Sequence, residues 1–319
     1  GRLLSNDKVK LGGLEDNKDN LLDIENLIIL GCGTSYNSGM IGMNYFKNIS
    51  GFNTVQLFDG AEFSILDIPK KGKTGFVLIS QSGETKDLHR CLDIAKNQNI
   101  VTIGVINAVD SLIAREVNCG CYLNCGREVG VASTKSFTSQ IILLNLMSIW
   151  FSQHKNINTQ KRLKYISDLL NLNNDLRNTI DNCENDVKNI IHLFNNQEAC
   201  FILGKYNEKS TACEGSLKIK ELSYIHAEGY SSSCLKHGPF ALLKDNFPVI
   251  LISPKNEYVS KNENIYQEIK SRNASIIYIT DEQIDRENTI IVSKNHTFQS
   301  LLCNIPLQFL AYHLSISKG

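Results

Sequence analysis

The stretch Asn-Leu-Ile-Ile-Leu-Gly-Cys-Gly-Thr-Ser at residues 26–35 decides the fold class. Its apolar run is short and ends in glycine, and residues 35–48 after it have helical character. Such a run is typical of a strand buried in a parallel sheet. The polar turn behind it is typical of a helix start. The stretch therefore predicts the strand–turn–helix unit of an α/β protein.

The run Ala-Cys-Phe-Ile-Leu-Gly at residues 199–204 repeats this pattern, and a helix is expected after it over 211–225. Further strands are expected at 54–58, 75–79, 101–106, 119–123, 248–252, 274–279 and 289–292, and long helices at 133–153 and 296–315. Strands that alternate with helices favour parallel sheets. The sequence thus predicts two similar α/β units, each a parallel sheet flanked by helices.

The spacing of these elements also predicts domain limits. Residues 1–21 are polar and Gly-rich, which indicates an N-terminal arm, and residues 22–156 form the first domain. Residues 157–196 are polar with Leu and Ile at helical spacing, which indicates a helical connector. Residues 197–319 form the second domain.

The composition narrows the function classes. Lys plus Arg and Asp plus Glu are both 33, so nothing points to a nucleic-acid or membrane-surface partner. The longest apolar stretch, 141–147, is far shorter than the ~20 residues that span a bilayer. Most of the ten cysteines lie in apolar runs, and the spacing of Cys119, Cys121 and Cys125 fits no common zinc pattern. We expect a reduced, cytoplasmic protein without a metal or cofactor.

Three hydroxyl-rich turns stand where strands end or a helix begins, at 31–35, 80–85 and 131–135. Hydroxyls and backbone N–H groups at a helix start bind phosphate, and ligands of a parallel sheet lie at the carboxyl ends of its strands. None of the turns matches a nucleotide-binding loop. The alternative is that these Ser and Thr residues are ordinary helix N-caps. A hydroxyl-lined site without a metal-binding carboxylate favours a sugar phosphate over a nucleotide.

Glu214, Lys218 and Glu221 have the spacing of one helix face. A solvated face with ion pairs is the ordinary interpretation, but a partly buried glutamate can also act as a general base. His237 lies in the turn-prone segment 236–239 and has a side chain suited to proton transfer near neutral pH. A lone loop histidine without a special role is the alternative.

The motifs together resemble a known family. Cys-Gly-Thr-Ser at 32–35, Ser-Gln-Ser-Gly-Glu-Thr at 80–85 and Glu-Val-Gly-Val-Ala-Ser-Thr-Lys at 128–135 resemble the first sugar isomerase (SIS) domain of glucosamine-6-phosphate synthases. Three later segments resemble the second SIS domain of these enzymes: Glu-Gly-Ser-Leu-Lys-Ile-Lys-Glu at 214–221, Tyr-Ile-His-Ala-Glu-Gly at 224–229 and Leu-Lys-His-Gly-Pro at 235–239. The resemblance runs from about residue 25 to the end, and it implies two flavodoxin-like three-layer domains.

The resemblance also implies residue roles. It assigns Glu221 to moving a proton between C1 and C2 of open-chain fructose-6-phosphate, with Glu214 and Lys218 in the same site. It assigns His237 to ring opening, lent by the neighbouring subunit of a homodimer. The implied phosphate ligands are Ser35, Ser80, Gln81, Ser82 and Thr85, and the implied sugar contacts are Thr34, Val131 and Ser133.

The implied reaction converts fructose-6-phosphate, with ammonia from glutamine, to glucosamine-6-phosphate, the start of UDP-N-acetylglucosamine synthesis. Slow formation of glucose-6-phosphate is the side reaction expected. We expect this chain to be the isomerase part, with a glutaminase domain in the full-length protein. The resemblance also implies a short tail after this region, whose lysine bonds the sugar carbonyl, and this sequence does not include it. Cys234 stands where the family commonly has Glu. A phosphosugar deglycase and a non-catalytic sugar-phosphate sensor remain as alternatives.

Overall fold

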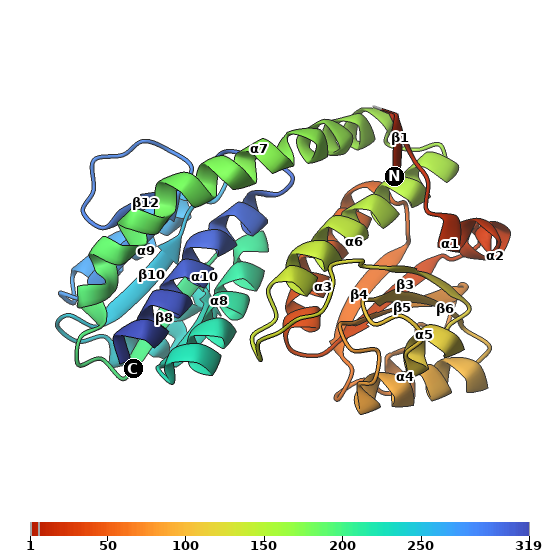
Figure 1. The fold of residues 1–319 in the computed structure, drawn as a ribbon, viewed down its shortest axis with the longest axis horizontal. Coiled ribbons are helices and arrows are strands. Elements are labelled where there is room, and N and C mark those ends of the chain that lie inside the picture. Colours follow the sequence, from red (N-terminus) through yellow and green to blue (C-terminus); the bar gives the residue numbers. More distant parts are fainter. Residues whose placement is uncertain (1, 6, 319) are drawn as a thin grey trace. The chain divides into compact units, whose positions relative to one another are not determined.

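The computed structural model describes residues 2–5 and 7–318 (Figure 1). The chain divides into two compact units, Gly1–Ser167 and Asp168–Gly319. Each unit is built around one parallel five-stranded sheet with helices on both faces. The predicted fold class, two flavodoxin-like α/β domains, is therefore confirmed.

The five strands of the first sheet do not follow one another in sequence order across the sheet, because the first of them lies second from one edge. In order across the sheet, the strands are β4 (Thr54–Asp59), β3 (Asn26–Gly31), β5 (Thr74–Ser80), β6 (Val101–Ile106) and β7 (Cys119–Tyr122). All neighbours pair in parallel. Every residue of β3 and β5 is buried, which explains why the apolar signal of these strands was strong in the sequence.

Helices cover both faces of this sheet (Figure 1). One face carries α3 (Thr34–Ile49) and α6 (Lys135–His154), and the other carries α4 (Lys86–Asn97) and α5 (Leu112–Glu116). A short 3₁₀ helix, η1 (Ile65–Asp67), follows β4. The core between the sheet and α4 includes Phe63, Phe76 and Leu92, all at most 1% exposed.

The segment before β3 is part of the packed unit. It contains β1 (Leu3–Ser5) paired with β2 (Lys8–Val9), then α1 (Gly12–Glu15) and α2 (Lys18–Leu22). Leu11, Leu14 and Leu21 are at most 1% exposed. The predicted polar arm thus carries a sparse set of leucines that bury against the unit.

The second unit repeats the strand order. Across the sheet the strands are β12 (Thr289–Ile291), β11 (Ser275–Thr280), β10 (Pro248–Ile252), β8 (Ala199–Gly204) and β9 (His226–Ser231). The helices are α7 (Thr159–Ile190), which spans the boundary between the units, α8 (Asn207–Ser223), α9 (Val259–Lys270) and α10 (Gln299–Lys318), with 3₁₀ helices η2 (Ile191–Phe194), η3 (Ser232–His237) and η4 (Pro239–Leu242). As β3 lies between β4 and β5, β8 lies between β9 and β10.

Two elements of this unit were not predicted. Strand β9 is an edge strand with only Ala227 buried, so its sequence lacks the apolar run of a central strand. Helix α9 carries mostly polar residues and buries only Asn262, Ile265 and Ile269. The helix predicted over 211–225 ends at Ser223, because Tyr224 adopts a left-handed conformation with φ of 58°.

Within the described ranges, no helix combines the length and the apolar character needed to cross a membrane. All ten cysteines of the chain have free thiols. In the same part of the chain, His, Cys, Asp and Glu side chains form no group of three that could hold a metal ion.

Candidate functional site

The first two hydroxyl-rich turns meet at one point of the first sheet. Strands β3 and β5 are neighbours, and the chain leaves them toward opposite sides of the sheet. The turn after β3 leads into α3, and the turn after β5 leads into α4. This is the topological switch point, where ligands of open α/β sheets bind at the carboxyl ends of the strands. The fold therefore places Thr34, Ser35 and residues 80–85 on the same edge.

Ser80 organises the second turn. It is 2% exposed, its Oγ accepts a hydrogen bond from the Gly83 N–H at 2.9 Å, and it lies 3.3 Å from Thr85 Oγ1. Gly83 has φ of +67°, and a Cβ there would lie 1.9 Å from Ser111 Oγ, so only glycine fits. The Ser82 Oγ accepts a hydrogen bond from the Glu84 N–H at 3.2 Å. Three hydroxyls thus gather in one compact turn.

Ser35 is held by a buried polar network rather than by solvent. The Gln140 Nε2 of α6 donates to Ser35 Oγ at 2.9 Å, and Ser38 Oγ donates to Gln140 Oε1 at 2.8 Å. Gln140 is completely buried, and Ser35 is 8% exposed. Because Gln140 donates to Ser35, the Ser35 hydroxyl keeps its own proton for another acceptor.

The ordinary interpretation of these residues as helix caps fails at two positions. Thr85 is the N-cap residue of α4 and Thr134 that of α6, yet neither side chain makes a capping hydrogen bond. An uncapped helix start leaves N–H donors that an anion can accept from. The α4 start therefore keeps its capacity for a phosphate.

The third turn differs from the prediction that it offers free N–H groups. The Glu128 carboxylate Oε1 accepts hydrogen bonds from Thr134 N at 3.1 Å, Ser136 N at 2.8 Å and Ser136 Oγ at 3.0 Å. The start of α6 is thus already satisfied by an anion of the chain itself. Val131, in the same segment, is 89% exposed, and Ser133 is partly buried. This turn presents side chains rather than a helix terminus.

A cavity of about 420 Å³ adjoins the second turn at the ends of β5, β6 and β7. Its lining consists of Gln81, Asn107, Ala108, Val109, Asn124, Gly126 and Arg127. Gln81 is thus shared between the cavity and the predicted phosphate turn. The predicted site residues did not include Asn107, Arg127 or Gln140, whose contacts depend on how loops and helices pack. Glu128 begins the 128–135 motif, but the sequence indicated no role for it.

In the second unit, Glu214, Lys218 and Glu221 share one face of α8, as their spacing predicts. The Lys218 Nζ lies 2.7 Å from Glu221 Oε2 and 3.6 Å from Glu214 Oε1. The side chains of Lys218 and Glu214 are 3% and 1% exposed, while that of Glu221 is 27% exposed. The helix face is therefore a buried ion triad with one carboxylate at the surface, not a solvated face.

His237 lies at the end of η3 and is exposed. Gly238 follows with φ of 137°, a conformation that requires glycine, and Pro239 then starts η4. Leu235 of η3 is completely buried and anchors the segment in the core. Among the residues that the structure describes, His237 forms no hydrogen bond or ion pair with the triad on α8. Cys234, in the same 3₁₀ helix, is exposed.

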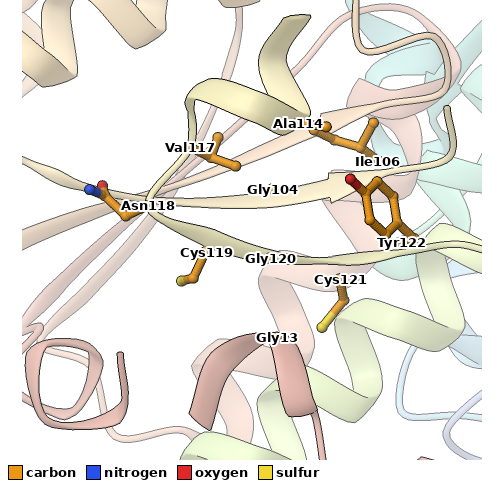
Figure 2. A pocket seen from close by; sticks show the side chains of 10 residues that line it. All are labelled: Gly13, Gly104, Ile106, Ala114, Val117, Asn118, Cys119, Gly120, Cys121 and Tyr122. Carbon is orange, nitrogen blue, oxygen red and sulfur yellow. The ribbon is translucent and has the colours of Figure 1, made fainter. Parts of the chain in front are cut away.

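A second cavity of the first unit, of about 260 Å³, lies at the β7 edge of the sheet (Figure 2). Gly13 of α1 closes one side, where a Cβ would lie 1.9 Å from the Gly120 carbonyl oxygen. Cys119 and Cys121 project from β7 toward this side (Figure 2). Burial raises the pKa of Cys119 to about 12 and that of Cys121 to about 11, so both remain thiols at neutral pH. None of the predicted site residues lines this cavity.

Comparison with known proteins agrees with this geometry. The SIS domain family matches residues 20–149 and 193–318, so the chain belongs to the SIS domain family. The C-terminal domain of glucosamine-fructose-6-phosphate aminotransferase from Francisella tularensis superimposes with a TM-score of 0.91, at 31% identity, over 99% of this chain and 90% of that one.

Two curated relatives extend this similarity. A probable glutamine–fructose-6-phosphate aminotransferase (isomerizing) of Acanthamoeba polyphaga mimivirus is 46% identical over 96% of this chain and 50% of its own length. The glutamine–fructose-6-phosphate aminotransferase (isomerizing) of Chlorobaculum tepidum is 34% identical over 98% of this chain and 52% of its own length. The chain thus spans about half the length of the curated relatives it matches.

Proposed function

We propose that this chain is the isomerase part of a glutamine–fructose-6-phosphate aminotransferase, acting on fructose-6-phosphate. The observation that carries the proposal is the ion triad on α8, in which a buried lysine holds a carboxylate that solvent can reach. A general base needs both a fixed position and access to its substrate. Glu221 has both, while Glu214 is enclosed.

The roles that we propose are divided between residues of the first unit and residues of the second. The neutral hydroxyl turns of the first unit anchor the phosphate, and Glu221 moves one proton between C1 and C2 of the open-chain sugar. Lys218 orients Glu221, Glu214 holds Lys218, and His237 assists ring opening. The proposed phosphate ligands are Ser35, Ser80, Gln81, Ser82 and Thr85, and the proposed sugar contacts are Thr34, Val131 and Ser133.

The partners of this reaction are proposed on the same basis. Ammonia would come from the glutaminase domain of a longer protein, which yields glucosamine-6-phosphate for UDP-N-acetylglucosamine synthesis. Isomerisation alone would yield glucose-6-phosphate. We place the enzyme in the cytoplasm, a compartment that suits ten free thiols.

Deuterium exchange at C1 of fructose-6-phosphate, followed by NMR, tests the proposal directly. The chain should catalyse exchange, and the Ser80→Ala/Ser82→Ala double variant should need a higher substrate concentration for the same rate. A phosphorylated fructosamine is supplied in parallel. Cleavage of that compound without exchange on fructose-6-phosphate would identify a deglycase, and binding of both without reaction would identify a sensor.

We further propose a homodimer in which His237 serves the site of the neighbouring subunit. Two inactive variants, Glu221→Gln and His237→Ala, should then regain activity when mixed, because one hybrid site carries both intact residues. Subunit exchange is monitored with differently tagged chains. Absence of recovery in chains that have exchanged would place both residues of a site in one subunit.

A further inference from the structure

The cavity beside the second turn contains one charged side chain, Arg127. It shares the 420 Å³ cavity with Gln81, which directly follows Ser80 at the end of β5. The remaining lining is neutral, from amide, apolar and glycine residues. A ligand that contacts Gln81 from the cavity side therefore lies in a cavity that Arg127 also lines.

Hydrogen bonds to neighbouring residues fix the backbone that carries Arg127. The Asn107 Nδ2 donates to the Gly126 carbonyl oxygen at 2.8 Å, and Asn107 Oδ1 accepts from the Cys125 N–H at 3.2 Å. The Lys135 Nζ donates to the Arg127 carbonyl oxygen at 2.5 Å. Arg127 thus extends from a loop that is held on both sides.

The carboxylates near this loop are occupied elsewhere. Glu128 accepts three hydrogen bonds at the start of α6, and Glu84 Oε1 accepts one from the Leu112 N–H at 2.8 Å. Asp110 lies 4.0 Å from Arg115. In the part of the chain that the structure describes, Arg127 has no carboxylate within ion-pair distance. Its positive charge is therefore uncompensated beside the cavity.

A phosphate ester is close to a dianion at neutral pH, and all five proposed phosphate ligands are neutral side chains. Hydrogen bonds become stronger when one partner is ionised, and guanidinium matches the geometry of phosphate. We infer that Arg127 supplies positive charge to the phosphate site from the cavity that it shares with Gln81, and that this charge favours the phosphate group of a sugar phosphate or free phosphate. The inference rests on the proposed function, whose phosphate site it completes.

Calorimetric titration of the full chain with inorganic phosphate, fructose-6-phosphate and fructose tests this inference. Arg127→Gln should weaken both phosphate ligands by about tenfold, the lower range for a charge-assisted hydrogen bond because the arginine is exposed. It should also reduce the dependence of binding on ionic strength, since one charge contact is lost. The matched control, Arg115→Gln, removes the same charge from an exposed arginine outside the cavity lining and should leave both affinities unchanged.

The outcomes separate the two proposals. Equal affinities of Arg127→Gln and the unaltered chain, with weaker binding in Ser80→Ala/Ser82→Ala, would overturn the role of Arg127 and leave the phosphate site in place. Weaker binding of fructose-6-phosphate but not of inorganic phosphate would also contradict it, because Arg127 would then contact the sugar. No binding of any phosphate by the unaltered chain would overturn both proposals.

Discussion

The two units share a scaffold down to the conformation of one turn. After β3, Gly33 has φ of 55° and ψ of −126°, and after β8, Tyr206 has φ of 59° and ψ of −112°. In both units the strand ends in a glycine where a Cβ would collide with the first turn of the following helix, at Gly31 and Gly204. The internal repeat predicted from the sequence pattern is thus a repeat of backbone geometry.

The side chains on this shared turn differ in charge. Ser35 follows Gly31 by four residues, and Glu208 follows Gly204 by four residues. Ser35 accepts a hydrogen bond from Gln140 of α6, whereas Glu208 Oε1 accepts one from Ser300 of α10 at 3.1 Å. A carboxyl group that ionises near neutral pH disfavours a second anion at that helix start. We therefore expect the shared scaffold to admit phosphate in the first unit and to disfavour it in the second.

The first prediction concerns the buried charges that distinguish the second unit. Lys218→Met should lower the free energy of unfolding by about 3–5 kcal/mol, because it removes the cation beside the enclosed Glu214. Lys73 of the first unit pairs with Asp23 at 46% and 69% exposure, so Lys73→Met should cost less than about 1 kcal/mol. Urea unfolding measures both. Equal losses in the two variants would show that burial does not make the Lys218 ion pair more important for stability than the Lys73 pair. The double variant Lys218→Met/Glu214→Leu should recover most of the stability that Lys218→Met loses.

The second prediction concerns pH. Burial is the main cause that raises the pKa of Glu208 from 4.5 to about 7. Between pH 4.5 and about 7, the Glu208 carboxyl group is ionised in the unfolded chain but protonated in the folded chain. The free energy of unfolding therefore falls as pH rises through this range, by at most about 3 kcal/mol. Glu208→Gln should abolish this slope and gain stability relative to the unaltered chain as pH increases. Urea unfolding at pH 5, 6 and 7.5 measures it, with the exposed Glu62→Gln as control. A parallel pH profile of Glu208→Gln and the unaltered chain would contradict the buried, raised-pKa state.

The third prediction concerns the shared turn and has the smallest effect. Gly33→Ala should cost about 1–3 kcal/mol from backbone strain alone, because no atom lies within 4 Å of the added Cβ. Tyr206→Gly relieves the same strain but loses the contact of Tyr206 with Tyr258, whose ring centroids are 5.8 Å apart. Its net change should stay within about 1 kcal/mol. Thermal unfolding of both variants checks the contrast, and a large loss in Tyr206→Gly would mean that the tyrosine contact outweighs the strain.

The sequence predicted the central strands well because their residues are buried on both faces and therefore apolar throughout. It missed β9, which lies at a sheet edge, and it treated residues 1–21 as an arm because Leu11, Leu14 and Leu21 are too sparse to show a period. The grouping of Glu214, Lys218 and Glu221 followed from helical spacing. The hydrogen bonds of Glu128 to the start of α6 could not be predicted, since they depend on how the loop before α6 folds. The domain limits at 22–156 and 197–319 and the roles of the site residues stay predictions.

The central claim is that Glu221, and not its enclosed neighbour Glu214, moves the proton. Deuterium exchange at C1 of fructose-6-phosphate is compared in the unaltered chain, Glu221→Gln and Glu214→Gln, each checked for folding by circular dichroism. Loss of a general base costs about 10²–10⁴-fold, so exchange in Glu221→Gln should fall by that factor. Glu214→Gln, which touches only Lys218 of the triad, should retain more activity. Exchange by Glu221→Gln at the rate of the unaltered chain would contradict the claim.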